Sequence, residues 1–183
     1  MRLPPHLPPT SPNTKSDTPL TLSKRTLILV ARKPYINGNA VEVKTTSSKT
    51  NEKIKISSEQ QMDTADVSGK LFLYVNMVRR SNSDGETLPE IIENIIHVLD
   101  DDTRELFEDK LFNYGYIMSC PERYKSGYFV RAKKCYDVID KFPCITRSKV
   151  MLGVSEISYA IDLNVCNEFQ IEWNDMINVI KEA

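Results

Sequence analysis

Residues 41–44 alternate valines with charged side chains, and this pattern constrains the fold more than any other part of the chain. In a strand, successive side chains point to opposite faces of the sheet. We therefore expect Val41 and Val43 on one apolar, buried face. Glu42 and Lys44 would project from the other face, about 7 Å apart along the strand.

The dipeptide Asn37-Gly38 precedes this strand and follows another β-prone run. Such a pair favours a two-residue hairpin turn, because both residues tolerate positive φ. With the turn at these positions, Ile36 pairs with Asn39, and continuing the register places Lys33 opposite Glu42. The sequence therefore predicts that the Glu42 strand pairs with the segment just before it.

Hydrophobic periodicity assigns the remaining elements and predicts an α/β fold with a mixed sheet. A capping box at Thr87 to Glu90 marks the start of one amphipathic helix. The expected strands are 26–31, 53–57, 70–78, 127–138 and 156–163, with a loop at 81–86. The expected helices are 57–62, opened by a serine cap, 87–99, 103–115 and 173–182.

Composition excludes several classes of protein. The chain has 183 residues, 40% of them hydrophobic, and a net charge of -1, which suits one domain with a real core. Its four cysteines lack Cys-X-X-Cys spacing, as expected for reduced thiols in a cytoplasmic protein. With His6 and His97 as the only histidines, a histidine metal site or a Ser-His-Asp triad is not expected. No apolar run reaches the ~20 residues that cross a bilayer, so no membrane partner is expected.

Residues 1–25 are rich in proline, serine and threonine and poor in large apolar residues. Such a segment cannot bury enough surface to offset its chain entropy, so we expect a disordered tail. A basic, acid-poor targeting peptide is the alternative interpretation. Residues 26–183 are then expected to form the folded domain.

Several stretches of the chain form a recognisable set in their order and spacing: Glu42-Val-Lys-Thr-Thr-Ser-Ser48, Ile56-Ser-Ser-Glu-Gln-Gln-Met62, Gly115-Tyr116, Cys135-Tyr-Asp-Val138, Phe142-Pro-Cys-Ile-Thr-Arg147, Gly153-Val-Ser-Glu-Ile-Ser-Tyr159 and Ile161-Asp-Leu163. With these stretches the chain resembles the PD-(D/E)XK nuclease superfamily, and more closely the bacterial members found near restriction-modification genes. The resemblance covers about residues 35–170 and implies a restriction-endonuclease-like mixed sheet flanked by helices.

This resemblance implies a role for three side chains. Glu42 would be a ligand of Mg²⁺, Lys44 the catalytic lysine, and Gln61 an accessory polar residue. Each has a simpler interpretation. Glu42 and Lys44 would otherwise form an exposed ion pair worth less than about 1 kcal/mol, and Gln61 would be an ordinary helix-surface residue.

The chain departs from the superfamily pattern at the first metal-binding acid, an aspartate on the strand before Glu-X-Lys. Residues 1–41 contain a single acid, Asp17, which lies in the proline-rich segment. One carboxylate alone binds Mg²⁺ poorly. We therefore expect a truncated or frame-disrupted copy that lacks the family's N-terminal half and has impaired activity. Asp17, a substrate phosphate or a partner subunit would otherwise complete the site.

Charge is unevenly distributed, which favours a polyanion such as DNA as a partner. Residues 84–110 carry ten acids against Arg104 and Lys110, whereas residues 121–149 carry eight bases, with aromatic residues between them. A solvated basic face over an aromatic core is the alternative. The candidate DNA-binding residues are Lys49, Arg123, Lys125, Arg131, Lys133 and Lys134.

Three functions remain open at this point. The resemblance predicts a Mg²⁺-dependent DNA endonuclease of restriction or phage-defence type, acting as a homodimer or with a restriction-modification partner. The missing acid favours a catalytically inactive nucleic-acid-binding remnant or accessory subunit. The acidic helices at 88–112 suit a protein-interaction module, although they also suit the solvated side of amphipathic helices.

Overall fold

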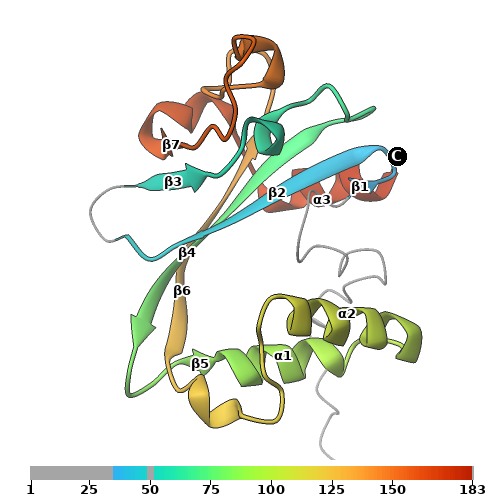
Figure 1. Cartoon of the computed structure of the whole chain (residues 1–183), viewed down its shortest axis with the longest axis vertical. Coiled ribbons are helices and arrows are strands. Elements are labelled where there is room, and N and C mark those ends of the chain that lie inside the picture. The colour runs from blue at the N-terminus through green and yellow to red at the C-terminus, as the bar shows by residue number, and fades with distance from the viewer. Residues whose placement is uncertain (1–34, 49–51, 183) are drawn as a thin grey trace, which may run out of the picture.

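The computed structural model describes residues 35–48 and 52–182 (Figure 1). The expected tail of residues 1–25, the expected strand of residues 26–31, the pairing of Lys33 with Glu42, and Lys49 lie outside these residues.

The described residues form β-strands, α-helices and short 3₁₀ helices. The strands are β1 (Tyr35–Ile36), β2 (Asn39–Thr46), β3 (Lys53–Ile56), β4 (Leu71–Ser81), β5 (Glu86–Thr87), β6 (Gly127–Asp137), β7 (Tyr159–Asp162) and β8 (Gln170–Ile171). The α-helices are α1 (Leu88–Ile96), α2 (Asp101–Asn113) and α3 (Trp173–Glu182). Short 3₁₀ helices are η2 (Glu59–Met62), η3 (Pro121–Arg123), η4 (Arg147–Lys149) and η5 (Leu163–Phe169).

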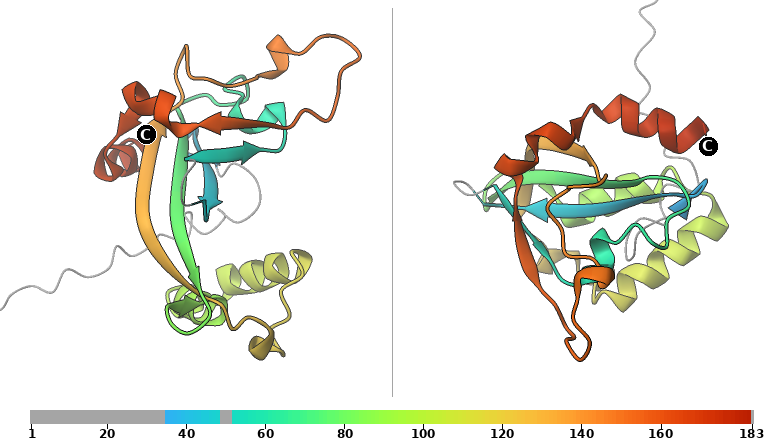
Figure 2. Two further views of the ribbon diagram at one scale, coloured as in Figure 1. Left: turned by 90° about the vertical axis from the view of Figure 1, so that its left-hand side faces the viewer. Right: turned by 90° about the horizontal axis from the view of Figure 1, so that it is seen from above.

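A mixed sheet in the order β1-β2-β4-β6-β5, with β8 also paired to β6, forms the centre of the molecule. Strands β2 and β4 are parallel, and the other pairs are antiparallel. Strands β3 and β7 form a separate antiparallel pair on one side of this sheet, and α3 lies on the other side (Figure 2). The predicted α/β architecture, a restriction-endonuclease-like mixed sheet flanked by helices, is confirmed.

The hairpin that starts the described chain follows the prediction. Asn37 and Gly38 have φ values of 52° and 79°, both in the left-handed region that such a turn requires. Tyr35 pairs with Ala40 and Ile36 with Asn39. Because β2 and β4 are parallel, the chain between them must cross over, and this crossover carries β3 and η2.

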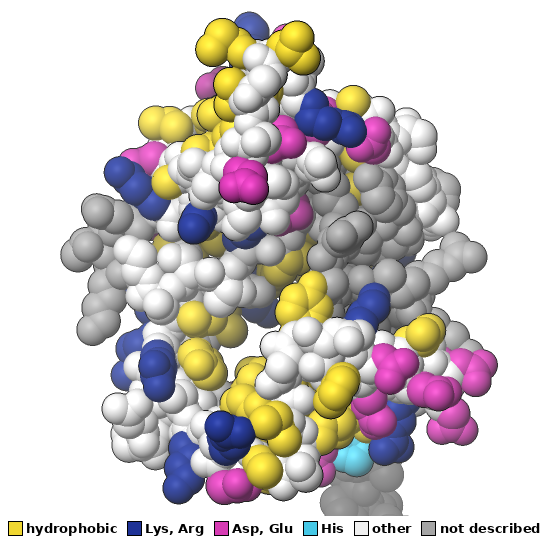
Figure 3. All heavy atoms as spheres, in the orientation of Figure 1, with side chains coloured by type: hydrophobic (Ala, Val, Ile, Leu, Met, Phe, Trp, Pro, Cys, Tyr) yellow, Lys and Arg dark blue, Asp and Glu magenta, His cyan; other side chains and the backbone are white. Residues whose placement is uncertain are grey.

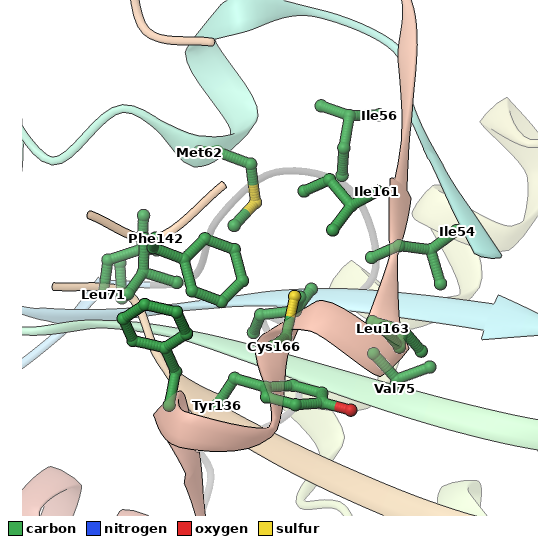
Figure 4. Close-up of a cluster of buried hydrophobic side chains, with 14 of the residues drawn as sticks. Ile54, Ile56, Met62, Leu71, Val75, Tyr136, Phe142, Ile161, Leu163 and Cys166 are labelled. Atoms are coloured by element: carbon green, nitrogen blue, oxygen red, sulfur yellow. The ribbon is translucent and has the colours of Figure 1, made fainter. Parts of the chain in front are cut away.

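Two apolar layers pack against the central sheet. The layer beneath β3 and β7 contains Ile56, Met62, Leu71, Tyr136 and Phe142, among others, all nearly inaccessible to solvent (Figure 4). The layer beneath α3 contains a smaller set of side chains: Val41, Phe72, Cys135, Met176 and Ile180. The sheet is therefore covered on both faces near the start of β2.

Helices α1 and α2 form a lobe with its own small core. The predicted capping box is present: the Thr87 N–H donates to Glu90 Oε2 at 2.7 Å, and the Glu90 N–H donates to Thr87 Oγ1 at 3.5 Å. Helix α2 begins at Asp101 rather than at the predicted Thr103, because Asp100 Oδ1 accepts from the Thr103 N–H and caps the helix. The lobe core comprises Ile92, Phe107, Leu111 and Tyr116.

Some predicted boundaries were wrong. Strand β7 begins at Tyr159 instead of residue 156, because Glu156 has a left-handed φ of 56°, which an extended strand cannot contain. Helix α1 ends at Ile96, three residues before the predicted Leu99. The predicted loop at 81–86 is shorter, since β4 extends to Ser81 and β5 begins at Glu86. Among the described residues, no helix has the length and apolar character needed to cross a bilayer.

Candidate active site

Glu42 and Lys44 form a close, poorly exposed ion pair on β2. Being two residues apart, they lie on the same face of the sheet. Lys44 Nζ lies 2.9 Å from Glu42 Oε1, and the two side chains are only 14% and 9% exposed, respectively. This pair therefore differs from the exposed ion pair that the tripeptide alone would suggest.

Burial of Glu42 corrects the prediction that its face is open and the valine face is buried. The Glu42 face lies beneath the β3–β7 pair, whereas α3 covers only the beginning of β2 on the opposite face. Val41 is consequently buried, but Val43 is 38% exposed. The sequence pattern missed this because alternation within one strand does not show which other segments, here β3, β7 and α3, pack on each face.

Gln61 joins the ion pair from the crossover between β2 and β4. Its Oε1 accepts a hydrogen bond from Lys44 Nζ at 2.8 Å and another from the Ser57 backbone N–H at 2.9 Å. The second bond ties the end of β3 to η2. The predicted serine cap is wrong, because the Ser58 side chain accepts no hydrogen bond from the backbone of η2. The side-chain oxygen of Gln61 instead bonds the backbone in front of the helix, at Ser57.

The three predicted catalytic side chains thus meet around the Lys44 ammonium. That ammonium has three N–H donors, of which two point to Glu42 and Gln61. Held this way, a lysine presents a fixed positive charge at one end of a mostly buried cluster. Such a charge can stabilise the negative charge that develops on a phosphate during hydrolysis.

The described residues do not by themselves complete a site for Mg²⁺. They place one carboxylate, Glu42, next to Lys44, and one of its oxygens is already paired with the ammonium. Within residues 35–48 and 52–182, no group of three or more acidic, histidine or cysteine side chains is arranged to hold a metal. Because Mg²⁺ prefers several hard oxygen ligands, further oxygen ligands would have to come from outside this set.

A second lysine lies on the same face as the pair. Lys44 and Lys134 are both in register with Val75, from opposite sides of β4. Two strand spacings therefore separate their backbones by about 10 Å. Lys134 Nζ lies 2.5 Å from Oε2 of Glu52, the residue directly before β3. Glu52 had not been predicted, and only the folded arrangement relates it to Lys134.

The predicted DNA-binding residues that the structure describes do not form one surface. Lys133 lies on the α3 side of β6, opposite to Lys134, because neighbouring residues of a strand alternate. Arg131 is exposed at a bulge in β6, and its guanidinium donates to the Ser48 carbonyl. Arg123 and Lys125 are exposed just before β6, beside the α1–α2 lobe.

Two further arginines lie near the end of β4. Arg79 lies over the Phe129 ring, with its guanidinium carbon 4.5 Å from the ring centroid, and Arg80 Nε donates to Ser126 Oγ. Neither arginine was predicted as a binding residue, although two consecutive arginines directly after the expected strand 70–78 were a usable signal. Figure 3 shows basic side chains beside this end of the sheet, and acidic ones gathered over the α1–α2 lobe.

The buried thiols are unsuited to nucleophilic chemistry. Burial raises the pKa of Cys135 to about 11, with a further contribution from Glu172. Burial also raises the pKa of Cys166 to about 11, with Asp162 adding to the effect. Both remain protonated at neutral pH, and a thiol is far less nucleophilic than a thiolate. Cys135 and Cys166 are both free, which agrees with the expectation of reduced thiols.

The mixed sheet, the parallel β2–β4 crossover and the Glu-X-Lys strand define a protein of the restriction-endonuclease-like class. Comparison with protein families supports this independently: the sequence model described as "Putative PD-(D/E)XK family member, (DUF4420)" matches residues 35–164. The match spans more than half of the chain, and the protein belongs to this family. No curated protein and no solved structure gave a significant match. Membership confirms the resemblance seen in the sequence and supports a nuclease-like function.

Proposed function

We propose that this protein is a Mg²⁺-dependent DNA endonuclease of restriction or phage-defence type that acts in the cytoplasm. The observation that carries the proposal is the convergence of Glu42, Lys44 and Gln61 on one poorly exposed site. Nucleases of the PD-(D/E)XK class use divalent metals, and Glu42 is the candidate metal ligand among the described residues. Mg²⁺ would supply charge neutralisation at the scissile phosphate.

Each of the three side chains has a physical task. Lys44 would offer its third N–H to a phosphate oxygen, because Glu42 and Gln61 occupy the other two. Gln61 fixes the direction of the ammonium, so little reorganisation is needed when the substrate arrives. Glu42 would change partner from Lys44 to the metal as the complex forms.

The DNA backbone would be held by the basic side chains around the sheet. Lys134 lies on the same face as Lys44 and is the nearest candidate in register. Arg123, Lys125 and Arg131 are exposed and would contact phosphates further along the duplex. Cutting both strands would require a second copy of the chain or a restriction-modification partner.

DNA binding without cleavage is a second candidate, and one observation favours it. The described residues bring only one carboxylate to the Lys44 site, and that carboxylate is already ion-paired. Without a further acidic ligand, the metal would bind weakly. The basic side chains do not depend on the metal, so their affinity for phosphates would persist.

Two assays on one protein preparation separate these candidates. Supercoiled plasmid is incubated with the folded protein in Mg²⁺, in Mn²⁺ and in EDTA, and binding to a duplex is measured at increasing salt. Metal-dependent nicking or linearisation supports the endonuclease. Salt-sensitive binding without cleavage supports the second candidate. Absence of both in a folded protein refutes a role on DNA and favours a protein-interaction module.

A further inference from the structure

The turn that carries Gln61 has little stability of its own. Helix η2 spans four residues, Glu59–Met62, and lacks a side-chain cap at Ser58. An isolated helical turn of this length is not stable in water, because forming its first turn fixes several residues for one hydrogen bond. Contacts from elsewhere must therefore hold Gln61 where Lys44 and Ser57 can bond to it.

Asp63, the residue after this turn, provides such a contact. It is only 5% exposed. Its Oδ2 accepts from Arg147 Nε at 2.8 Å and from the Arg147 backbone N–H at 3.1 Å, and its Oδ1 accepts from the Ala65 N–H at 3.0 Å. The Arg147 guanidinium also binds Asp66. Arg147 thus binds both ends of the four-residue segment 63–66, although it lies 84 positions away from Asp63 in the sequence.

The pKa of Asp63 agrees with this geometry. Burial alone would raise it, but the hydrogen bonds from the Arg147 side chain, from the two backbone N–H groups, and the arginine charge together lower it. The ionised carboxylate is therefore the form that the fold stabilises. The ionised Asp63 therefore stabilises the folded protein fully at a pH above the ordinary aspartate pKa of about 4. This contribution is lost as the pH falls through the pKa that Asp63 has in the folded protein, which is lower.

The segment around Arg147 holds the turn at a second point. Met62 is completely buried in the layer beneath β3 and β7, where Phe142 is also buried (Figure 4). Cys144 Sγ lies 3.8 Å from the Met62 carbonyl oxygen, within range of a weak hydrogen bond. Residues 142–147 therefore contact the two residues that directly follow Gln61: Met62 through packing and a weak hydrogen bond, and Asp63 through the Arg147 bonds.

We propose that Asp63 and Arg147 are positioning residues that fix Gln61, and through it the Lys44 ammonium, in the geometry of the active site. The proposal rests on the proposed function of Lys44 and Gln61. A turn held by its neighbours moves when they are removed, and displacement of a positioning group by about 1 Å is enough to lower a rate about a hundredfold. Neither residue would touch the substrate.

The first test needs no enzymatic activity. The backbone N–H of Ser57 bonds to Gln61 Oε1, so its hydrogen exchange reports whether Gln61 is in place. In Asp63→Asn and in Arg147→Lys, we expect exchange at Ser57 to be about tenfold faster, as for loss of one charge-assisted hydrogen bond. The amide of Leu73 in the central strand should be unaffected. Unchanged exchange at Ser57 in both variants would overturn the proposal.

A matched control is available in the α1–α2 lobe. Arg104 Nε binds Glu108 at 2.8 Å, so Arg104→Lys alters an arginine-carboxylate pair of the same length away from the site. This variant should leave Ser57 exchange unchanged. If Arg104→Lys accelerates exchange at Ser57 equally, the effect is a general loss of stability and the positioning role is refuted.

Cleavage kinetics provide the second test and keep the two proposals separate. If the wild type cuts DNA, Asp63→Asn should lower kcat with little change in KM, because the contact surface for DNA is intact. Equal kcat in wild type and variant would refute the positioning role. If the wild type cuts no DNA, the endonuclease proposal fails, and the exchange measurement still decides whether Asp63 and Arg147 position Gln61.

Discussion

Replacing Lys44 by methionine should destabilise the folded protein by about 3–5 kcal/mol, the usual effect of leaving one partner of a buried ion pair alone. Lys44 Nζ and Glu42 Oε1 are 2.9 Å apart, and the side chains are 14% and 9% exposed. At that distance, two unit charges attract by about 6 kcal/mol for an effective dielectric constant of about 20. The variant loses this attraction while Glu42 remains beneath the β3–β7 pair.

Urea unfolding at pH 7, followed by circular dichroism, measures the effect. The double variant Glu42→Gln/Lys44→Met should recover much of the loss, because neither charge then remains buried. A matched control is Lys53→Met: Lys53 Nζ lies 4.0 Å from Asp162, and these side chains are 53% and 41% exposed. The control should lose less than about 1 kcal/mol. An equally small loss in Lys44→Met would refute the description of the pair as buried.

Three other changes have definite expected outcomes. Asn39→Ala should cost about 2–4 kcal/mol in urea unfolding, because the buried Asn39 side chain bonds to backbone groups of residues 70 and 179; a loss under about 0.5 kcal/mol would contradict this. Gly127→Ala should lower the melting temperature, since an added Cβ would lie 2.0 Å from the Asp84 carbonyl oxygen, and overpacking costs about 1–3 kcal/mol; an unchanged melting temperature would argue against that close approach. Lys125→Ala should weaken DNA binding and reduce the salt slope by about one, because Lys125 is exposed and is one of the proposed phosphate contacts, whereas Lys110→Ala in the acidic lobe should not; equal effects of the two variants would argue against phosphate contact by Lys125.

Local chemistry made part of the fold predictable. The Asn37-Gly38 turn sets the hairpin register by itself, since both residues accept positive φ, and the structure has the predicted pairs. The Thr87–Glu90 capping box likewise depends on neighbouring residues alone. The candidate roles of Glu42 and Lys44 came from the family resemblance, because the sequence Glu-Val-Lys alone does not indicate a catalytic site.

The rest depends on contacts between distant segments. Alternation along β2 correctly placed Glu42 and Val43 on opposite faces of the sheet. It did not show that the β3–β7 pair covers the charged face, nor that Val43 is exposed although Val41 is buried. No local pattern links Asp63 to Arg147 across 84 positions, nor Lys134 to Glu52 across 82. Charge along the sequence suggested one set of DNA-binding residues, whereas strand face and register decide which of these residues lie together in the fold.

Cleavage of supercoiled plasmid by the wild type and by Glu42→Gln/Lys44→Met is the most direct test of a nuclease site built on Lys44. The double variant is the proper control because it should remain folded. We expect the wild type to nick or linearise plasmid in Mg²⁺ or Mn²⁺, and the double variant to be at least about a hundredfold slower. Equal cleavage by both proteins would place the activity elsewhere. Intact plasmid in both metals, with a folded wild type that still binds DNA, would contradict catalysis by this site.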